Sequence, residues 1–479
     1  MSKHMVALDC GNSSYRIVLG KYENGKIESE VIRQIPNGTV KRDGYYYWDI
    51  KGIFEGFLEG LAELVKRKIR IDSIGICTWG VDFALFDQKG SMIQDPLCYR
   101  NQIGEEILEK LSAEEKRELF YHTGILCDKI NSVYMLKGMQ KYFPEVMKKA
   151  EKYLMIPDII NYFLTGVMIH EPTELSTSQM MDSESGEINP EVCKKFGISE
   201  HLFSPVGSHG KKIGMVKKEL LKRIGADYEI PVICVPSHDT ASAVAAIPAG
   251  EHHFGFISCG TWSLIGAELD APVKRDEVIK AKLTNEMGAF GKITLLKNNA
   301  GMFIVNCLKK EYEAAQGRKV SWEKITEMAE EAKEGLVMDL NDMAFFNPSD
   351  MSQAVWDYLM EKEQVSGEKD WGQIFRAFYE SLAFSYAATI RDIETVVGRT
   401  FEKIYMVGGG TASRLLLKLT ADYTGKTIIT CYGESTSMGN LAVQLKYFYP
   451  ELDLIKLREI VSKSYRTART EAGTRRGGK

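Results

Sequence analysis

The sequence predicts an α/β protein of two related domains whose sheets are covered by helices. Short apolar runs typical of buried strands alternate along the whole chain with segments of helical periodicity, which is the pattern of an α/β architecture. A strand followed by a glycine-containing, hydroxyl-rich turn occurs twice, at residues 8–14 and again at 258–263. With 479 residues and about 150 residues per domain, the chain can form several cores. One weak repeat of this strand-and-turn pattern, separated by about half of the chain, favours two related domains over a solenoid.

The first half opens with strands and one amphipathic helix. Strands are expected at residues 6–8, 17–19 and 71–77, the first two on either side of the turn at 11–14. A helix is expected over residues 53–68, with Asp49 near its N-cap. Its apolar residues fall at i, i+3 and i+4 spacing on one face, and they are Phe54, Phe57, Leu58, Leu61, Leu64 and Val65.

The second half repeats this alternation. Strands are expected at residues 231–235, 254–258 and 404–407, a small-residue helix at 241–246, and a helix at 415–423 that Gly425 ends. We expect domains at 1–245 and 246–465, joined by the small residues around Ala245–Gly250. The remainder, 466–479, mixes Arg, Thr and Gly without periodicity and is expected to be a mobile, solvated end.

Composition excludes several functional classes. A formal net charge of −4 supplies no cationic field for nucleic acid. The nine cysteines contain no C-x-x-C pair, which indicates a reduced, cytoplasmic protein. No signal-like region precedes Asp9, and the most apolar later stretch, residues 230–249, is broken by His238 and Asp239. We therefore expect neither nucleic acid nor membrane as a partner.

One segment places two ionisable groups directly after a buried strand. Ser237-His238-Asp239-Thr240 precedes the helix expected at 241–246. Phosphoryl transfer to an alcohol needs a carboxylate near the attacking hydroxyl, so Asp239 is a candidate base. The structural alternative is a capping Asp beside a satisfied His.

Three other segments could either contact a ligand or have a purely structural role. Asp9 ends a strand before the Gly/Ser turn, from which a carboxylate can hold Mg²⁺; the alternative is an Asx-turn residue. Gly408-Gly409-Gly410, between strand and helix, permits close approach of a nucleotide, or is a tight turn. Trp79 suits a sugar ring, or core packing. The chain contains no G-x-x-x-x-G-K-[ST] sequence, so a P-loop is ruled out.

These segments occur together in an order that resembles the rhamnulokinase branch of the FGGY carbohydrate kinases, over nearly the whole chain. The matching segments are Asp9-Cys10-Gly11-Asn12-Ser13-Ser14, Thr78-Trp79-Gly80-Val81-Asp82-Phe83, Tyr99-Arg100, Ser237-His238-Asp239-Thr240-Ala241-Ser242-Ala243, Gly260-Thr261-Trp262-Ser263-Leu264, Leu296-Lys297-Asn298, Glu380-Ser381-Leu382-Ala383 and Val407-Gly408-Gly409-Gly410. The resemblance implies a two-domain, actin-like (ribonuclease-H-like) ATPase fold with a cleft between the domains, where ATP and sugar meet.

The resemblance also implies roles for individual residues. Asp239 is the expected general base and Asp9 the Mg²⁺-side carboxylate. Sugar contacts are expected from Trp79, Gly80, His238, Thr240 and Asn298. Contacts to ATP are expected from Asn12, Ser13, Ser14, Tyr15, Arg16, Thr261, Asn306, Gly408 and Gly409.

The expected reaction is therefore ATP- and Mg²⁺-dependent phosphorylation of a deoxy-ketohexose, L-rhamnulose first, by a monomer or small homo-oligomer. Cys77 stands where Asp is usual, and Tyr15, Asn101 and Asn306 also depart from the pattern. We interpret these departures as concerning the sugar side, which leaves L-fuculose or another ketose open. A non-catalytic actin-like sugar sensor is the alternative from another class.

Overall fold

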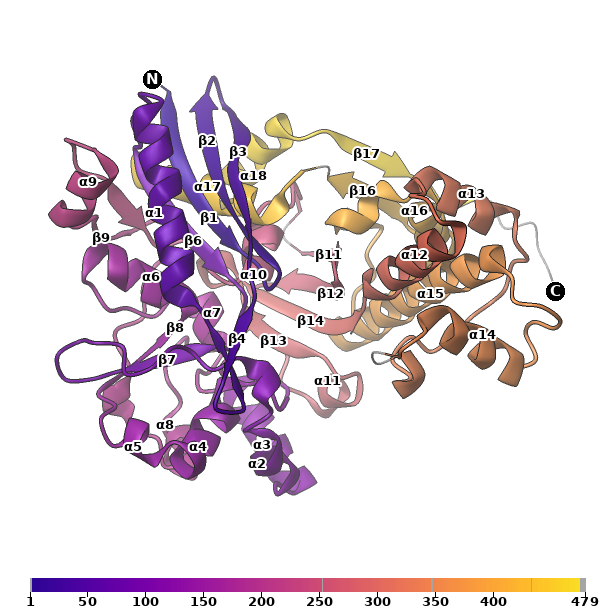
Figure 1. The fold of residues 1–479 in the computed structure, drawn as a ribbon, viewed down its shortest axis with the longest axis horizontal. Coiled ribbons are helices and arrows are strands. Elements are labelled where there is room, and N and C mark those ends of the chain that lie inside the picture. The colour runs from indigo at the N-terminus through magenta and orange to yellow at the C-terminus, as the bar shows by residue number, and fades with distance from the viewer. Residues whose placement is uncertain (1, 252, 346–347, 432, 474–479) are drawn as a thin grey trace. The chain divides into compact units, whose positions relative to one another are not determined.

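A computed structural model describes residues 2–251, 253–345, 348–431 and 433–473 (Figure 1). The chain forms two compact units. Unit 1 contains Met1–His252, Glu268–Leu295 and Glu434–Tyr465, and unit 2 contains His253–Ala267, Leu296–Gly433 and Arg466–Lys479. The division differs from the expected one because two later segments pack with the first. The helices of Glu434–Tyr465 supply side chains to a core beneath the N-terminal sheet.

Unit 1 is built on a six-stranded sheet. Its strand order is β3-β2-β1-β6-β10-β9. β1 pairs antiparallel with β2 and parallel with β6, while β10 pairs antiparallel with β9. The bounds are β1 Lys3–Cys10, β2 Ser14–Glu23, β3 Lys26–Pro36, β6 Ser73–Thr78, β9 Lys212–Met215 and β10 Pro231–Ile233. The strand expected at 231–235 is thus shorter than predicted.

Helices cover both faces of this sheet because alternate side chains of β1 point to opposite sides. Val6 and Leu8 join a core with α1 (Ile50–Lys66), whereas Met5 and Ala7 join a second core with α17 (Ser435–Phe448) and α18 (Leu454–Ser464). Figure 1 shows α1 lying along the sheet. The predicted helix is confirmed, and Asp49 is its N-cap, where the side chain accepts a hydrogen bond from Gly52 N at 2.9 Å.

The remaining elements of unit 1 are short. Its two-stranded sheets pair β4 with β5 and β7 with β8. The strand bounds are β4 Thr39–Arg42, β5 Tyr45–Trp48, β7 Phe83–Phe86, β8 Lys152–Met155 and β13 Thr284–Met287. The helices are α2 Glu105–Glu109, α3 Ala113–Thr123, α4 Ser132–Tyr142, α5 Pro144–Met147, α6 Ile156–Thr165, α7 Pro172–Ser176, α8 Pro190–Phe196, α9 Lys218–Ile224, α10 Asp239–Ala245 and α11 Asp276–Lys280.

Unit 2 repeats the strand order of unit 1. The seven-stranded sheet runs β13-β14-β12-β11-β15-β16-β17, and its six strands from β14 onwards have counterparts in the series β3-β2-β1-β6-β10-β9. In both units the two central neighbours pair in parallel and the final pair is antiparallel. The bounds are β11 Phe254–Cys259, β12 Trp262–Leu269, β14 Ile293–Ala300, β15 Lys403–Val407, β16 Thr427–Cys431 and β17 Thr467–Thr470. A duplicated α/β domain produces such a repeat.

The helices of unit 2 include the longest of the described chain, α15 (Trp371–Val397). The others are α12 Phe303–Gln316, α13 Trp322–Glu331, α14 Met351–Glu361 and α16 Arg414–Thr424, which ends at Gly425 as expected. Across the described residues, no helix combines the length and apolarity that crossing a bilayer requires.

The chain end differs from the sequence expectation. Thr467–Thr470 pair antiparallel with β16, from Ile428↔Thr470 to Cys431↔Thr467. Backbone pairing needs no apolar periodicity, so the Arg/Thr composition did not reveal this strand. Residues 474–479 of the predicted mobile end lie outside the described residues.

Candidate active site

Asp239 is the first residue of α10, and its position is fixed by close helix packing. The helix consists of small residues and lies against α17, where a Cβ added at Gly439 would stand 1.8 Å from Ser242 O. Thr436 Oγ1 also donates a hydrogen bond to Asp239 O at 3.4 Å. The Asp239 side chain remains 39% exposed. The carboxylate is therefore held on a rigid backbone yet is accessible to a ligand.

His238, the N-cap of α10, lies between two carboxylates. Its Nε2 is 3.5 Å from Asp239 Oδ1, and its Nδ1 is 3.2 Å from Oε2 of Glu286 in β13. Burial lowers the pKa of His238, but the carboxylates of Glu286, Asp239 and Glu171 together outweigh it and raise that pKa to about 9. His238 is thus an imidazolium at neutral pH. Sequence reasoning missed Glu286, which lies 48 positions away on another element.

Asp9, at the end of β1, belongs to a charged cluster. Its Oδ2 accepts hydrogen bonds from Arg16 Nη2 at 3.0 Å and from Ser437 Oγ at 2.6 Å. Arg16 also pairs with Glu434. Burial raises the pKa of Asp9, Arg16 and Ser437 oppose that rise, and the neighbouring Asp239 carboxylate adds to it. The two acids predicted from the sequence therefore lie close enough to interact electrostatically.

The expected first phosphate turn is the β1–β2 connection, closed by a hydrogen bond from Gly11 N to Ser14 O at 3.0 Å. Asn12 Oδ1 is buried and has no hydrogen-bond partner within the described part of the chain. Ser13 is exposed. Tyr15 differs, because its ring is buried beneath α1 at Gly56, where an added Cβ would be 2.0 Å from its hydroxyl. The side chain of Tyr15 is therefore not available to a ligand.

Trp79 is packed into the core rather than lying open on the surface. It is 4% exposed, its ring centroid lies 4.2 Å from that of Trp48, and both indole N–H groups donate to Asp82 Oδ2, Trp79 at 2.9 Å and Trp48 at 2.5 Å. Burial raises the pKa of Asp82 to about 7, although both indoles lower it. An aromatic pair thus shields an acid beside Gly80.

The residue between Gly80 and Asp82 has an unusual backbone. Val81 has φ +70°, which is costly for a β-branched side chain. Hydrogen bonds on both sides hold it: Val81 N donates to Thr177 Oγ1 at 3.0 Å, and Ser132 Oγ donates to Val81 O at 2.5 Å. Such strained residues concentrate at functional sites. This conformation was not predictable from the sequence.

Two of the sequence departures have internal roles, which corrects the interpretation that all of them concern the sugar. Cys77 is fully buried, with Sγ donating to Leu8 O at 3.4 Å and accepting from Asn440 Nδ2 at 3.4 Å. The side chain of Asn101 accepts from Tyr46 N at 2.7 Å and donates to Tyr46 O at 2.7 Å. Both side chains thus complete hydrogen bonds of the fold.

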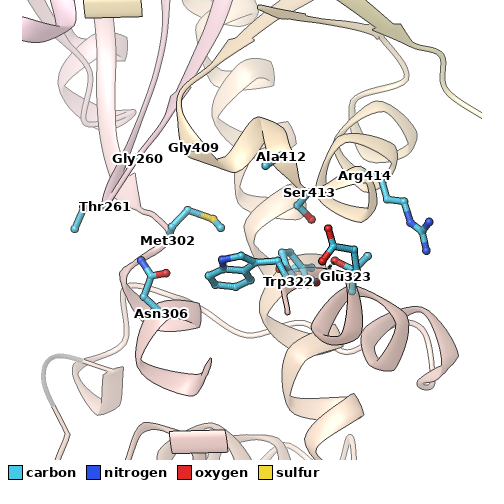
Figure 2. Close-up of a pocket in the computed structure, with 12 residues that line it drawn as sticks. Gly260, Thr261, Met302, Asn306, Trp322, Glu323, Gly409, Ala412, Ser413 and Arg414 are labelled. Atoms are coloured by element: carbon cyan, nitrogen blue, oxygen red, sulfur yellow. Dashed lines mark hydrogen bonds between the residues drawn. The ribbon is translucent and has the colours of Figure 1, made fainter. Parts of the chain in front are cut away.

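Unit 2 contains a pocket of about 490 Å³ that collects predicted nucleotide residues (Figure 2). Thr261, Asn306 and Gly409 line it, and Figure 2 shows the Trp322 indole inside it near Met302 and Asn306. The other lining residues are Gly260, Glu323, Thr326, Tyr379, Ala412, Ser413 and Arg414. Sequence reasoning missed Trp322 and Met302, since neither belongs to a recognisable motif. The departure at Asn306 thus lies in this pocket.

Glycines allow the backbone around this pocket to come together. Gly408 has φ +89°, and a Cβ there would be 2.6 Å from Cys259 O. A Cβ at Gly301 would be 2.6 Å from Thr261 O. Asn298 is exposed on β14 and belongs to unit 2, whereas Gly80, Trp79, His238 and Thr240 belong to unit 1.

The family comparison assigns these repeated α/β units to a sugar-phosphorylating enzyme. Residues 4–246 match the N-terminal domain of the FGGY family of carbohydrate kinases, and residues 255–446 match its C-terminal domain. The chain belongs to the FGGY family and is a carbohydrate kinase.

Similar proteins agree with this assignment. The chain is 34% identical to a rhamnulokinase of Bacteroides thetaiotaomicron (97% of this chain, 95% of the relative) and 32% identical to one of Bacillus subtilis (96% and 93%). Its fold matches a xylulose kinase of Lactobacillus acidophilus with a TM-score of 0.80 at 16% identity (98% and 94% coverage). A Plasmodium falciparum glycerol kinase with ADP matches with a TM-score of 0.79 at 15% identity (98% and 94%). The fold is the expected actin-like ATPase fold.

Proposed function

We propose that this kinase transfers the γ-phosphoryl group of ATP to a primary hydroxyl of L-rhamnulose, giving L-rhamnulose 1-phosphate and ADP. The rhamnulokinase relatives support this sugar. The observation that carries the proposal is the carboxylate of Asp239, 39% exposed at the rigid start of α10 beside the cationic His238. A base for an alcohol acceptor needs this combination of accessibility and fixed position.

In the proposed reaction, Asp239 accepts the proton of the attacking hydroxyl. A bond forms between the sugar oxygen and the γ-phosphorus, the bond from that phosphorus to the β,γ-bridging oxygen breaks, and ADP leaves. His238 and Thr240 flank Asp239, and Thr240 Oγ1 donates to its Oδ1 at 3.2 Å. These residues and Gly80, all of unit 1, orient the sugar. Positioning and charge neutralisation supply most of the rate enhancement.

We assign ATP to the pocket of unit 2. Trp322 and Met302 offer the apolar surface that an adenine ring needs, and Gly409 and Thr261 provide backbone that phosphates can approach. Gly408 lets the strand end pack against Cys259 behind them. In unit 1, the proposed phosphate contacts belong to the β1–β2 turn and are Asn12, Ser13, Ser14, Tyr15 and Arg16. Arg16 is the cation of this group, and it is already paired with Asp9 and Glu434.

Asp9 suits an Mg²⁺ ion that arrives with the nucleotide. Within the described ranges, no cluster of three or more His, Cys, Asp or Glu residues could hold a metal. Mg²⁺ typically needs only one or two carboxylates besides phosphates and water. Arg16 and Ser437 bind Oδ2 of Asp9, so Oδ1 is the oxygen that would face the ion. The ion would neutralise charge on the β- and γ-phosphates.

A reduced compartment suits the nine cysteines, all of which are free thiols. We therefore propose a cytoplasmic enzyme that acts on small molecules as a monomer or small homo-oligomer. Light scattering of the purified protein measures the assembly state directly.

The deciding experiment is an ADP-release assay with Mg-ATP and a panel of ketoses and polyols that includes L-rhamnulose and L-fuculose. We expect the highest kcat/KM with L-rhamnulose. A clearly higher kcat/KM with L-fuculose would show that L-fuculose, and not L-rhamnulose, is the substrate. Sugar binding by calorimetry without ADP release for any sugar would favour the non-catalytic sensor.

A further inference from the structure

Glu286 was not predicted from the sequence, and the proposed mechanism assigns it no role. It lies in β13, whose other residues are anchored. Asn285 Nδ2 donates to Gly124 O at 2.9 Å, and Met287 N donates to Ser176 Oγ at 3.0 Å. Side chains alternate along a strand. The Glu286 side chain therefore projects opposite the buried side chains of Asn285 and Met287 and is 13% exposed.

This projection brings Glu286 to the face of His238 away from the candidate base. His238 Nδ1 is 3.2 Å from Glu286 Oε2, and His238 Nε2 is 3.5 Å from Asp239 Oδ1. The imidazole side chain is 11% exposed, and His238 N donates to Thr173 Oγ1 at 3.1 Å. Each ring nitrogen therefore faces a carboxylate at ion-pair distance and the backbone N–H is hydrogen-bonded, although Nδ1 makes no hydrogen bond of regular geometry with any described residue.

An imidazole with a carboxylate at each nitrogen carries a proton on both. A neutral ring could donate from only one nitrogen and would have to accept at the other, but a carboxylate is an acceptor only. The charged groups that face His238 are Glu286 from β13, Asp239 from α10, and Glu171 at the N-cap of α7. Glu171 is already engaged, since it accepts hydrogen bonds from Thr173, Glu174 and His209. Glu286 is thus the carboxylate available to balance the imidazolium.

We propose that Glu286 is a positioning residue for phosphoryl transfer, holding His238 doubly protonated with Nε2–H directed towards Asp239 and the sugar. The inference rests on the proposed function of this same site. The imidazolium attracts the Asp239 carboxylate by charge across 3.5 Å, and its Nε2–H is the donor for a sugar oxygen. Loss of the Glu286 charge makes it easier for the ring to lose a proton. The neutral ring then exists as two tautomers, and only one of them carries the Nε2–H.

The first test compares Glu286→Gln with wild type over pH 6 to 9, using kcat/KM for L-rhamnulose. In wild type the pKa near 9 keeps His238 charged at pH 8. If the pKa returns to about 6.5 in the variant, the charged fraction at pH 8 falls about 30-fold, but at pH 6 it falls less than about twofold. We expect kcat/KM to follow this pattern. An equal loss at both pH values would indicate a merely structural role and overturn the proposal.

Three further variants sharpen the result. Glu286→Asp keeps the charge, so the fall of kcat/KM at alkaline pH, which we call the alkaline limb, should occur at the same pH as in wild type. Glu277→Gln, on the exposed surface of α11 in the same segment, is the matched control and should leave the profile unchanged. His238→Gln should abolish the limb. Persistence of the limb in His238→Gln would assign it to another group and overturn the proposal even if Glu286→Gln fails to fold.

An NMR titration separates this inference from the proposed reaction, because it needs no substrate. The ¹³Cε1 signal of His238, assigned with His238→Gln, should have its midpoint near pH 9 in wild type. Glu286→Gln should lower that midpoint by at least about one pH unit. A shifted midpoint with no kinase activity on any ketose would overturn the proposed function and leave the Glu286–His238 pair standing. An unshifted midpoint would overturn the pair.

Discussion

Replacement of Asp239 by Asn tests the central residue of the site with the smallest change of shape. The amide oxygen can still accept the hydrogen bond from Thr240 Oγ1, which is 3.2 Å long in the native protein. The side chain is 39% exposed, so the change in unfolding free energy should stay within about 0.5 kcal/mol. An amide, however, cannot accept the proton of the attacking hydroxyl.

The expected loss follows from this missing proton acceptor. General base catalysis typically contributes about 10² to 10⁴ in rate, which is about 3–5 kcal/mol of activation free energy. We expect kcat for ADP release to fall by that factor, while calorimetry shows nearly unchanged sugar binding. Asp227→Asn, an exposed position in the same unit, serves as the control. A folded Asp239→Asn protein with near-normal turnover would refute the assignment of Asp239 as base.

Three other variants probe the surrounding groups. Asp9→Ala should slow turnover and weaken productive Mg-ATP binding, yet leave sugar affinity without nucleotide nearly unchanged by calorimetry; a large loss there would make Asp9 structural. Trp322→Ala should raise the KM for ATP about tenfold, since stacking on a base is worth about 1–3 kcal/mol, and an equal rise in the KM for sugar would contradict the assigned pocket. Asp82 has a pKa near 7 when folded, above its unfolded value, so its contribution to stability is lost as pH rises from about 4 to 7. Urea unfolding of Asp82→Asn should show a smaller decline over that range than wild type, and parallel declines would place the titration elsewhere.

The sequence predicted what local patterns encode. The helix capped by Asp49 and the helix ended by Gly425 were confirmed because capping and periodicity act within a few residues. The sequence also predicted that Asp9 and Asp239 lie near each other, because each belongs to a continuous motif that can be recognised without the structure.

What the sequence did not predict depends on contacts between distant segments. Glu286 and Ser437 reach the site from strands and helices far along the chain, and no spacing rule marks them. Strand β17 forms because β16 offers an edge, not because its own residues alternate. Cys77 looked like an altered sugar contact until its burial beside Asn440 became visible.

The placement of α17 and α18 has a consequence for how the protein is made. These helices cover the side of the first sheet that presents Met5, Ala7 and Val18, yet ribosomes synthesise them more than 400 residues after β1. At a synthesis rate of about 5–20 residues per second, that apolar side of the sheet stays uncovered for roughly 20–80 s until the two helices are made. Nascent chains released before residue 435 should therefore bind chaperones or aggregate, and the first unit should acquire protease resistance only after α18 has left the ribosome.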